Sequence, residues 1–553
     1  MAKEGHKYLF VLGGVMSGVG KGVVTSSIGL LLQQRGYTVN LVKIDPYLNV
    51  DAGTMNPTEH GETFVLRSGL ETDQDMGNYE RFLGRDLTNE DYMTSGMVYQ
   101  SVINRERALE YGGKCIEAIP HVRDEILRRI EAAASYNDSK ISVIEIGGTI
   151  GDFQNALFIE AARVLKMNHP EDVLFAIVSY LPTPGTLGEM KTKPTQTAVR
   201  DLNSYGVQPD FIVARSKETI DEKRKEKLAI WCNVQKESII AAPDISSIYE
   251  APLNFEKDGF GDAILSAFRL PEKRAVSLAA WKKFAAAVAD IKAPEVKIAI
   301  VGKYFDTGDF VLSDAYLSVI EAIKFSAAKL GRRASITWVN SKHFEKKGAR
   351  PAALLAGFQG ILVPGGFGES GIEGKIKAIQ FARENKIPYF GLCYGMQLMV
   401  IEYARNVLGL KDATTTEIKK HAAHPVVDVM LEQKEKLSQN KYGGTMRLGA
   451  YPAYLKKGTL ARAAYKKELV EERHRHRYEI NGAYVKQLED AGLVFSGTSP
   501  DGVLMEIAEL PRAKHPFMLG TQFHPELKAR PLDPHPLFTE FLRAASTHKR
   551  RRS

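Results

Sequence analysis

Short apolar runs alternate with longer amphipathic stretches through the first half of the chain. The runs lie at residues 8–12, 39–44, 141–146, 173–179 and 211–214. Each has the length of a buried strand, and the segments between them are long enough for helices. Strands that alternate with helices predict a parallel sheet covered on both faces. Residues 49–111 break this pattern because they are rich in Gly, Asp and Thr, and so long an excursion is usually functional.

A second series of apolar runs that alternate with amphipathic stretches begins after residue 270. Leu278, Trp281, Ala285 and Val288 recur at helical spacing and predict one amphipathic helix in a linker over residues 271–295. Further strands are predicted at residues 297–301, 336–339, 360–363 and 388–392. We therefore expect an α/β fold with two doubly wound three-layer domains. The expected ranges are 1–270 for the first domain, 296–545 for the second and 546–553 for a disordered basic tail.

Composition narrows the class of protein. Apolar residues make up 44% of the 553 residues and charged residues 25%, which is ordinary globular composition and excludes a wholly disordered chain. The net charge is +8, and Lys549, Arg550, Arg551 and Arg552 supply half of it. The remaining excess is mild, so it suits anionic ligands and does not predict a nucleic-acid partner.

Cysteine usage and hydropathy predict a reduced, cytoplasmic setting without a membrane. Cys115, Cys232 and Cys393 form no CxxC pair and cannot make a disulfide framework. No stretch reaches the ~18 apolar residues that a membrane helix needs. The apolar run from Tyr8 resembles a signal peptide, but it ends in a glycine-rich loop and not in a small-residue cleavage site.

The loop after the first predicted strand is typical of a phosphate site. Glycines allow backbone N–H groups to converge on phosphate oxygens, and the following helix adds its positive dipole end. The candidate residues are Ser17, Gly18, Val19, Gly20, Lys21 and Gly22. Gly22 stands where the standard loop has a Ser or Thr that holds magnesium, so Asp75 and Glu145 are candidate metal ligands. The alternative is a tight turn without a ligand.

Further cations lie near predicted strand ends. Lys43 follows one strand, and a later segment adds lysines beside hydroxyl and amide donors: Lys191, Thr192, Lys193, Pro194, Thr195 and Gln196. Such groups suit a triphosphate, and the alternative is an exposed polar loop.

Cys393 has the surroundings of a nucleophile. The pattern Gly391-Leu392-Cys393-Tyr394-Gly395 follows an apolar strand and precedes an apolar helix, as in a nucleophile elbow. The helix N-terminus favours the thiolate. His524 is the candidate base and Glu526 its orienting carboxylate.

Two other segments are candidates for the same site. Glycines 365 and 366 end a predicted strand, and their backbone N–H groups are suited to an oxyanion hole. Residues 473–477 read Arg-His-Arg-His-Arg, the densest cationic cluster inside a domain. Its alternatives are a solvated face or a metal-binding tract, and the absence of nearby cysteine disfavours the metal.

Together these motifs resemble the CTP synthase family over residues 5–545. The phosphate loop, LVKIDPYLNVDAGTM, EHGE, VIEIGGTIGD, GEMKTKPTQ, VPGGFG, GGTMRLGA, ERHRHRYE and QFHPE stand in the family's order. The resemblance implies an amidoligase domain that uses MgATP to phosphorylate O4 of UTP. It also implies a class I glutamine amidotransferase domain that supplies ammonia through the protein. It further implies a homotetramer that is activated by GTP and inhibited by CTP. Members of this family can assemble into filaments, and the sequence does not decide whether this chain does.

The resemblance also implies roles for individual residues. Catalytic roles fall on Cys393, His524 and Glu526, and glutamine binding falls on Gly366, Gln397, Glu417 and Arg477. ATP binding is implied for Ser17 to Gly22, Lys43 and Asp75. Magnesium binding is implied for Asp75 and Glu145. UTP or CTP binding falls on Ser17, Asp152, Phe153, Gln154, Lys191 to Gln196 and Lys227. Arg447 matches the lid that responds to GTP.

Two residues depart from the family's pattern, and three other interpretations compete with it. Gln154 stands where many relatives have Glu in a CTP contact, and Tyr394 follows the nucleophile where Leu is commoner. A cobyrinate-type amidase is disfavoured by the KTKPTQ and LVKIDPY segments. A partition-type ATPase with an inert second domain is disfavoured by Cys393, His524 and Glu526. A structural role in filaments is compatible with catalysis.

Overall fold

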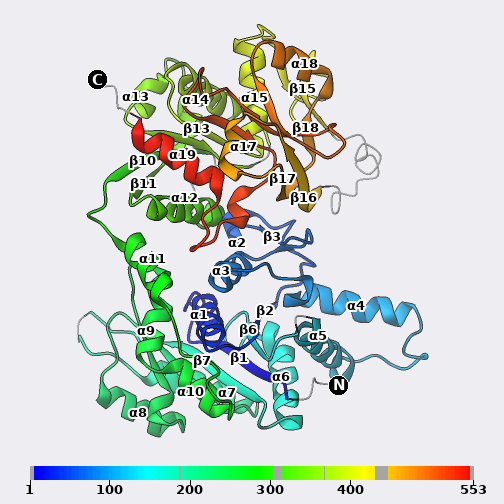
Figure 1. The fold of residues 1–553 in the computed structure, drawn as a ribbon. Coiled ribbons are helices and arrows are strands. Elements are labelled where there is room, and N and C mark those ends of the chain that lie inside the picture. Colours follow the sequence, from blue (N-terminus) through cyan, green and yellow to red (C-terminus); the bar gives the residue numbers. More distant parts are fainter. Residues whose placement is uncertain are drawn as a thin grey trace. The chain divides into compact units, whose positions relative to one another are not determined.

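The computed structural model describes residues 5–136, 138–185, 188–302, 313–366, 368–429 and 446–548. The chain divides into two compact units (Figure 1). The first unit contains residues 1–52 and 75–289, and the second contains residues 53–74 and 290–553. The expected range of 1–270 for the first domain therefore differs in two places. Residues 53–74, which we call the inserted segment, belong to the second unit, and residues 271–289, expected in a linker, belong to the first unit. The disordered basic tail predicted over residues 546–553 begins too early, because residues 546 and 547 end the helix α19 (Pro536–Thr547). Residues 549–553 lie outside the described residues.

A seven-stranded parallel sheet forms the centre of the first unit in its described part. In sheet order the strands are β5 (Tyr92–Thr94), β2 (Val39–Asp45), β6 (Ile141–Ile146), β1 (Lys7–Gly14), β7 (Val173–Tyr180), β8 (Phe211–Ser216) and β9 (Ile239–Pro243). The five predicted strands are confirmed. The short edge strand β5 and the strand β9 were not predicted.

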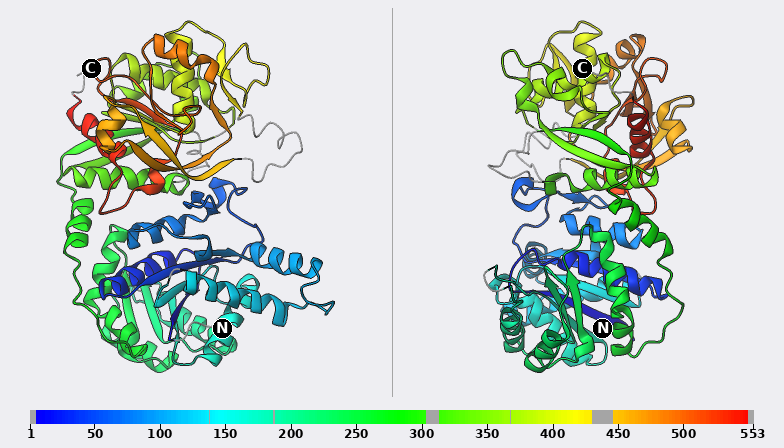
Figure 2. Two further views of the ribbon diagram at one scale, coloured as in Figure 1. Left: turned by 45° about the vertical axis from the view of Figure 1, so that its right-hand side comes forward. Right: turned by 90° about the vertical axis from the view of Figure 1, so that its left-hand side faces the viewer.

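Helices cover both faces of this sheet (Figure 2). The helices in the described part of this unit are α1 (Lys21–Gln34), α3 (Gln74–Leu83), α4 (Ser95–Arg107), α5 (Arg123–Tyr136), α6 (Ala156–Asn168), α7 (Lys193–Ser204), α8 (Glu222–Cys232), α9 (Ala251–Lys257), α10 (Phe260–Ala267) and α11 (Ala279–Ala289), of which α4 and α11 lie away from the faces of the sheet (Figure 1). Alternate residues of β1 face opposite sides, so Tyr8, Phe10 and Leu12 join one core with α5, α6 and α7. The amphipathic helix predicted around Trp281 is confirmed as α11, but it belongs to the first unit and not to a linker. Trp281 donates a hydrogen bond to Tyr249 O at 2.8 Å.

The second unit contains a nine-stranded mixed sheet in its described part. Its parallel part is β11 (Arg333–Asn340), β10 (Glu295–Gly302), β12 (Gly360–Val363), β13 (Tyr389–Leu392) and β21 (Met518–Thr521). The antiparallel part is β20 (Met505–Glu509), β19 (Val494–Thr498), β16 (Arg447–Leu455) and β17 (Leu469–His476). The four strands predicted here are confirmed within their parallel part.

Smaller elements complete the second unit. A three-stranded sheet is formed by β14 (Ala413–Thr415), β15 (His424–Val429) and β18 (Tyr478–Ile480). In the described residues after 290, the helices are α12 (Leu317–Lys329), α13 (Pro351–Leu355), α14 (Ile372–Glu384), α15 (Tyr394–Asn406), α17 (Leu460–Tyr465), α18 (Gly482–Asp490) and α19 (Pro536–Thr547). The inserted segment contributes α2 (Pro57–His60) and the hairpin β3 (Phe64–Val65) and β4 (Glu71–Thr72).

Candidate active sites

Cys393 occupies a sharp turn between β13 and α15. Its φ of 49° and ψ of −100° put a non-glycine residue in a strained conformation. A Cβ atom on Gly391 would lie 2.6 Å from the carbonyl carbon of Gly395, and one on Gly395 would lie 2.2 Å from Val363 O. Both flanking glycines are therefore required by close contacts, and the predicted elbow is confirmed. The turn places the thiol at the positive end of α15.

His524 and Glu526 lie at this thiol. His524 Nδ1 is 2.7 Å from Glu526 Oε1. A Cβ atom on Gly365 would lie 2.9 Å from His524 Cε1 and 3.7 Å from Cys393 Cβ, so the imidazole and the thiol border the same glycine. Burial by itself lowers the pKa of His524, but Glu526 and Cys393 raise that pKa to about 10. The site therefore favours the imidazolium form of His524 beside the sulfur, and a positive charge at that position is typical of sites that activate a cysteine.

A small cavity of about 100 Å³ opens beside the sulfur within the second unit. Part of its wall comes from the inserted segment, which the sequence did not associate with this site. The lining residues are Pro57, Glu62, Thr63, Ala315, Tyr316, Val319, Gly365, Gly366, Cys393, Arg475, His524, Glu526 and Leu527. The Glu62 carboxylate accepts from Ser318 N at 3.0 Å, so it caps the start of α12 and fixes this wall.

Of the residues expected to bind glutamine, one lines this cavity, and the others have the following contacts. Gly366 lines it. Gln397 is buried, and its Nε2 donates to Tyr478 O at 2.9 Å and to Gln522 Oε1 at 3.2 Å. Glu417 accepts from Gly368 N at 2.8 Å. Burial and Glu417 raise the pKa of Tyr478 whereas Arg477 lowers it, so both charges lie near that ring.

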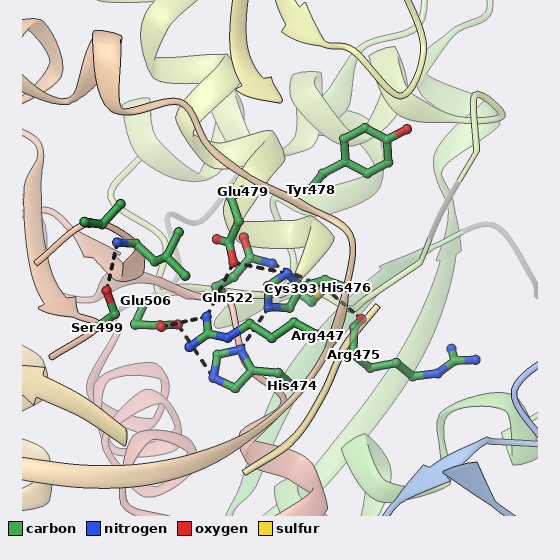
Figure 3. Close-up of polar contacts among 12 residues, drawn as sticks. Cys393, Arg447, His474, Arg475, His476, Tyr478, Glu479, Ser499, Glu506 and Gln522 are labelled. Carbon is green, nitrogen blue, oxygen red and sulfur yellow. Dashed lines mark hydrogen bonds and ion pairs between the residues drawn. The ribbon is translucent and has the colours of Figure 1, made fainter. Parts of the chain in front are cut away.

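The alternation Arg-His-Arg-His-Arg has a structural explanation in β17. His474 and His476 point into a buried polar cluster with Arg447, Glu479 and Glu506, which we call the histidine–carboxylate cluster (Figure 3). His474 Nδ1 is 2.9 Å from His476 Nε2. Among the described residues, no group of three or more His, Cys, Asp or Glu side chains forms a metal site. The metal-tract interpretation therefore gains no support there.

Arg447 is the cation of this cluster. Its Nη1 is 2.8 Å from Glu506 Oε1 and 3.4 Å from Glu479 Oε1, and the residue is 7% exposed. Burial, and then Glu506, raise the pKa of Glu479 well above its usual value despite Arg447. The residue expected in a GTP-responsive lid thus points into the core, and residues 430–445 before it lie outside the described part.

The phosphate loop of the first unit joins β1 to α1. Gly18 and Gly20 have φ of 71° and 89°, which only glycine adopts readily, and Gly20 precedes the first turn of α1. Lys21 is buried and donates from Nζ to Gly148 O at 2.9 Å. Burial lowers the pKa of Lys21, and Glu145 opposes that shift. Free backbone N–H groups at this helix end can bind an anion.

Two expected metal ligands converge behind this loop. Lys43 Nζ donates to Asp75 Oδ2 at 2.6 Å and to Glu145 Oε1 at 2.8 Å. Burial raises the pKa of Glu145, which the Lys43 charge opposes. For Asp75 burial acts in the same direction, but Lys43 prevails and the pKa is lowered. Two carboxylates that share one cation are a donor set that suits Mg²⁺ together with phosphate oxygens.

A cavity of about 470 Å³ beside the loop was not foreseen. It adjoins Gly20 and the first turn of α1, and its far side comes from β9 and the residues that follow. Its lining is Gly20, Val23, Val24, Arg215, Ala242, Pro243, Asp244, Ile245, Ile248, Ala251, Asn254 and Phe255. A mostly apolar cavity next to a phosphate loop can take a planar base. The apolar run at residues 239–243, which forms β9, was the sequence feature that could have indicated a buried strand beside this cavity.

The residues expected to contact UTP occupy several loops of the first unit. Thr195 and Gln196 are buried in the first turn of α7, where Thr195 Oγ1 accepts from Ser179 Oγ at 2.9 Å. Lys191 pairs with Glu189 at 2.6 Å. Asp152 accepts from Thr149 N at 2.8 Å, and Phe153 is 98% exposed. Ser17, Gln154, Lys193 and Lys227 are exposed.

Comparison with known proteins agrees with both halves of the chain. Residues 7–270 match the family model described as CTP synthase N-terminus, and residues 311–544 match that of class I glutamine amidotransferases. The fold and the Cys393 site thus define a glutamine-dependent amidotransferase joined to a second catalytic domain. The chain belongs to the CTP synthase family, whose members are glutamine-hydrolysing C–N ligases.

Curated relatives match almost the whole chain, and a solved structure matches part of it. CTP synthase of Pyrococcus furiosus is 49% identical over 99% of both chains, and that of Caldanaerobacter subterraneus is 48% identical over 97% of this chain and 98% of its own. A solved structure of the glutaminase domain of Trypanosoma brucei CTPS with bound acivicin is 39% identical. It covers 46% of this chain and 95% of its own, with a TM-score of 0.42. In the described part of the chain, no helix has the length and hydropathy to span a membrane.

Proposed function

We propose that the protein makes CTP from UTP in two coupled reactions. One site uses ATP to phosphorylate O4 of UTP, and the other releases ammonia from glutamine. Ammonia adds to C4 of the phosphorylated ring, and inorganic phosphate leaves. The convergence of Lys43, Asp75 and Glu145 behind a phosphate loop, in a chain that also holds Cys393, is the observation that carries this proposal.

In the glutaminase reaction, the Cys393 sulfur attacks the carboxamide carbon of glutamine. His524 gives its proton to the leaving ammonia, and a thioester remains. Water then adds to the thioester, with His524 as base, and releases glutamate. Glu526 holds the ring through the 2.7 Å contact to Nδ1, which leaves Nε2 to face the reacting atoms. Gly366, Gln397, Glu417 and Arg477 are the proposed glutamine-binding residues.

In the phosphorylation reaction, backbone N–H groups of residues 17–22 and the Lys21 ammonium hold the ATP phosphates. The cavity beside Gly20 receives the base. Asp75 and Glu145 would hold Mg²⁺, which supplies charge neutralisation for the transferred phosphoryl group. Lys43 balances these carboxylates. Residues 152–154, residues 191–196, Ser17 and Lys227 are the proposed contacts for UTP or CTP.

Regulation and assembly complete the proposal. We propose activation by GTP, inhibition by CTP and a homotetramer, on the strength of the family. We also propose a cytoplasmic location, where reducing conditions keep the Cys393 thiol free.

The test is CTP formation from UTP and MgATP with either glutamine or ammonium as nitrogen source, with and without GTP. We expect activity with both donors, and stimulation by GTP only with glutamine. The Cys393→Ala variant should lose the glutamine-dependent reaction and keep the ammonium-dependent one, whereas Lys21→Ala should lose both. Absence of CTP with both donors, in folded wild-type protein, would contradict the proposed substrate.

A further inference from the structure

Strand β17 presents different residues to its two sides. Cβ atoms alternate along a strand, so residues 471, 473 and 475 face one way and residues 472, 474 and 476 the other. The even-numbered side chains, Glu472, His474 and His476, are 2%, 0% and 5% exposed and point into the core of the second unit. The odd-numbered side chains all contact the inserted segment.

Each odd-numbered residue holds a different point of the inserted segment. Glu471 pairs with Arg67 at 2.8 Å. Arg473 donates from Nη1 to Val65 O at 3.0 Å. Arg475 donates from Nε to Glu71 Oε1 at 2.7 Å and from Nη2 to Gly53 O at 3.3 Å.

The Arg475 contacts lie at the two ends of the inserted segment. Gly53 is its first residue, and Glu71 lies three residues before its last. A Cβ atom on Gly53 would lie 2.1 Å from Glu71 Oε2, so these two residues already pack tightly against each other. Glu71 is 7% exposed. One guanidinium therefore joins both ends of the inserted segment to β17 in a largely buried ion pair.

The backbone of the same residue lies at the nucleophile. Cys393 Sγ is 3.8 Å from Arg475 O, within hydrogen-bond distance for sulfur (Figure 3). Arg475 also lines the small cavity beside Cys393 and His524. Because catalysis depends on sub-ångström placement, a shift of this carbonyl changes how the sulfur is held.

The chain itself connects these contacts to the nucleotide site. The inserted segment continues directly into Ala52 at one end and into Asp75 at the other, and both belong to the first unit. Asp75 accepts from Lys43 behind the phosphate loop. Displacement of Asp75 by a ligand therefore acts through only three intervening residues on Glu71, the partner of Arg475.

We propose that Arg475 is a positioning residue that couples the nucleotide site to Cys393. Its side chain moves with the two ends of the inserted segment, and its backbone carbonyl sets the position of the Cys393 thiol. The inference rests on the two-site function proposed above, because it assigns the ligands of the first unit as nucleotides.

The experiment measures alkylation of Cys393 by iodoacetamide in the full chain, with and without UTP and a non-hydrolysable ATP analogue with Mg²⁺. In wild-type protein the nucleotides should change the alkylation rate severalfold. In Arg475→Gln this nucleotide response should disappear, and Arg475→Lys should restore part of it because an ammonium can still pair with Glu71. The matched control is Arg67→Gln, which also loses a contact between the inserted segment and β17, but Arg67 is exposed and does not line the cavity beside Cys393.

Steady-state kinetics separate positioning from a general structural role. For Arg475→Gln we expect kcat for glutamine hydrolysis to fall about tenfold with little change in KM, and the ammonium-dependent reaction to stay unchanged. Glu71→Gln should reproduce the loss, and the double variant should be no worse than either single one. Additive losses, or a wild-type nucleotide response in Arg475→Gln, would overturn the inference.

Failure of the proposed function has a different signature. In that event wild-type protein would form no CTP with either nitrogen source. A nucleotide response of Cys393 that Arg475→Gln removes would still support the coupling in such a protein, and its persistence would still contradict it.

Discussion

The Asp75 carboxylate lies against Gly22 and fills the space that a Ser or Thr side chain would occupy at this position of a standard phosphate loop. A Cβ atom on Gly22 would lie 2.3 Å from Asp75 Oδ1. The standard loop has Ser or Thr at this position, where the hydroxyl binds magnesium. In this chain the glycine admits a carboxylate from α3, and Lys43 holds that carboxylate in place.

Gly22→Ser should therefore damage the loop although it restores the standard motif. The new side chain displaces Asp75, and a displacement of ~1 Å can lower a rate about 100-fold. We expect CTP formation to fall with both glutamine and ammonium, whereas basal glutamine hydrolysis continues. The control is Gly482→Ser, where a Cβ atom meets nothing within 4 Å. An undiminished ammonium-dependent rate in Gly22→Ser would contradict this assignment.

Removal of the Lys43 charge should make the protein depend on magnesium for stability. Lys43→Met leaves Asp75 and Glu145 without their shared cation, and loss of one partner from a buried ion pair costs ~3–5 kcal/mol. Mg²⁺ that binds the two carboxylates should recover part of this loss.

Thermal unfolding with and without Mg²⁺ checks this prediction. We expect a larger rise in Tm with Mg²⁺ for Lys43→Met than for wild-type protein. Arg163→Met is the control, because the ion pair of Arg163 with Glu160 is partly exposed and such pairs contribute about 1 kcal/mol or less. An equal Mg²⁺ effect in all three proteins would argue against a metal at these carboxylates.

Glu526 should control the pH range of the glutaminase site. The pKa of His524 is raised to about 10, so the imidazolium is retained below that pH and lost above it. Glu526→Gln removes one cause of the raised pKa, because a neutral amide no longer stabilises the imidazolium by charge. We expect the alkaline limb of the pH profile of glutamine hydrolysis to move to lower pH, because the imidazolium supplies the proton for the leaving ammonia. A profile identical to that of wild-type protein would exclude an electrostatic role for Glu526.

The strands and the nucleophile turn were predictable because their signals are local. Buried parallel strands are continuous apolar runs, and glycines around Cys393 indicate a turn that only small residues allow. The contacts of Gly391 and Gly395 explain those glycines by steric exclusion. The pairing of His524 with Glu526 was also local, since only one residue separates them.

The place of the inserted segment could not be predicted in the same way. Its contacts with β17 join residues about 400 positions apart, such as Glu71 and Arg475, and no local pattern specifies them. The run of alternating Arg and His indicated a charged cluster, but its division into one set for the inserted segment and one for the core follows from strand alternation in β17. Neither the cavity beside Gly20 nor β9 was assigned, because a five-residue apolar run fits several kinds of buried segment.

Arg447 should be a major source of stability for the second unit. It is buried between Glu479 and Glu506, so Arg447→Met leaves two buried carboxylates without a cation, which costs ~3–5 kcal/mol at neutral pH. The pKa values of Glu479 and Glu506 are already raised by burial in the wild-type protein, and loss of the opposing Arg447 charge raises them further. The folded variant therefore binds more protons than its unfolded state, and its stability falls as pH rises. Chemical denaturation should show a smaller deficit in the free energy of unfolding, relative to wild-type protein, at pH ~5 than at pH ~8.

Two further variants test the electrostatic explanation. Glu506→Gln added to Arg447→Met should recover part of the loss, whereas Arg67→Met, at an exposed ion pair, should cost about 1 kcal/mol or less. A deficit that does not vary with pH would show that Arg447 stabilises the cluster by packing and not by charge.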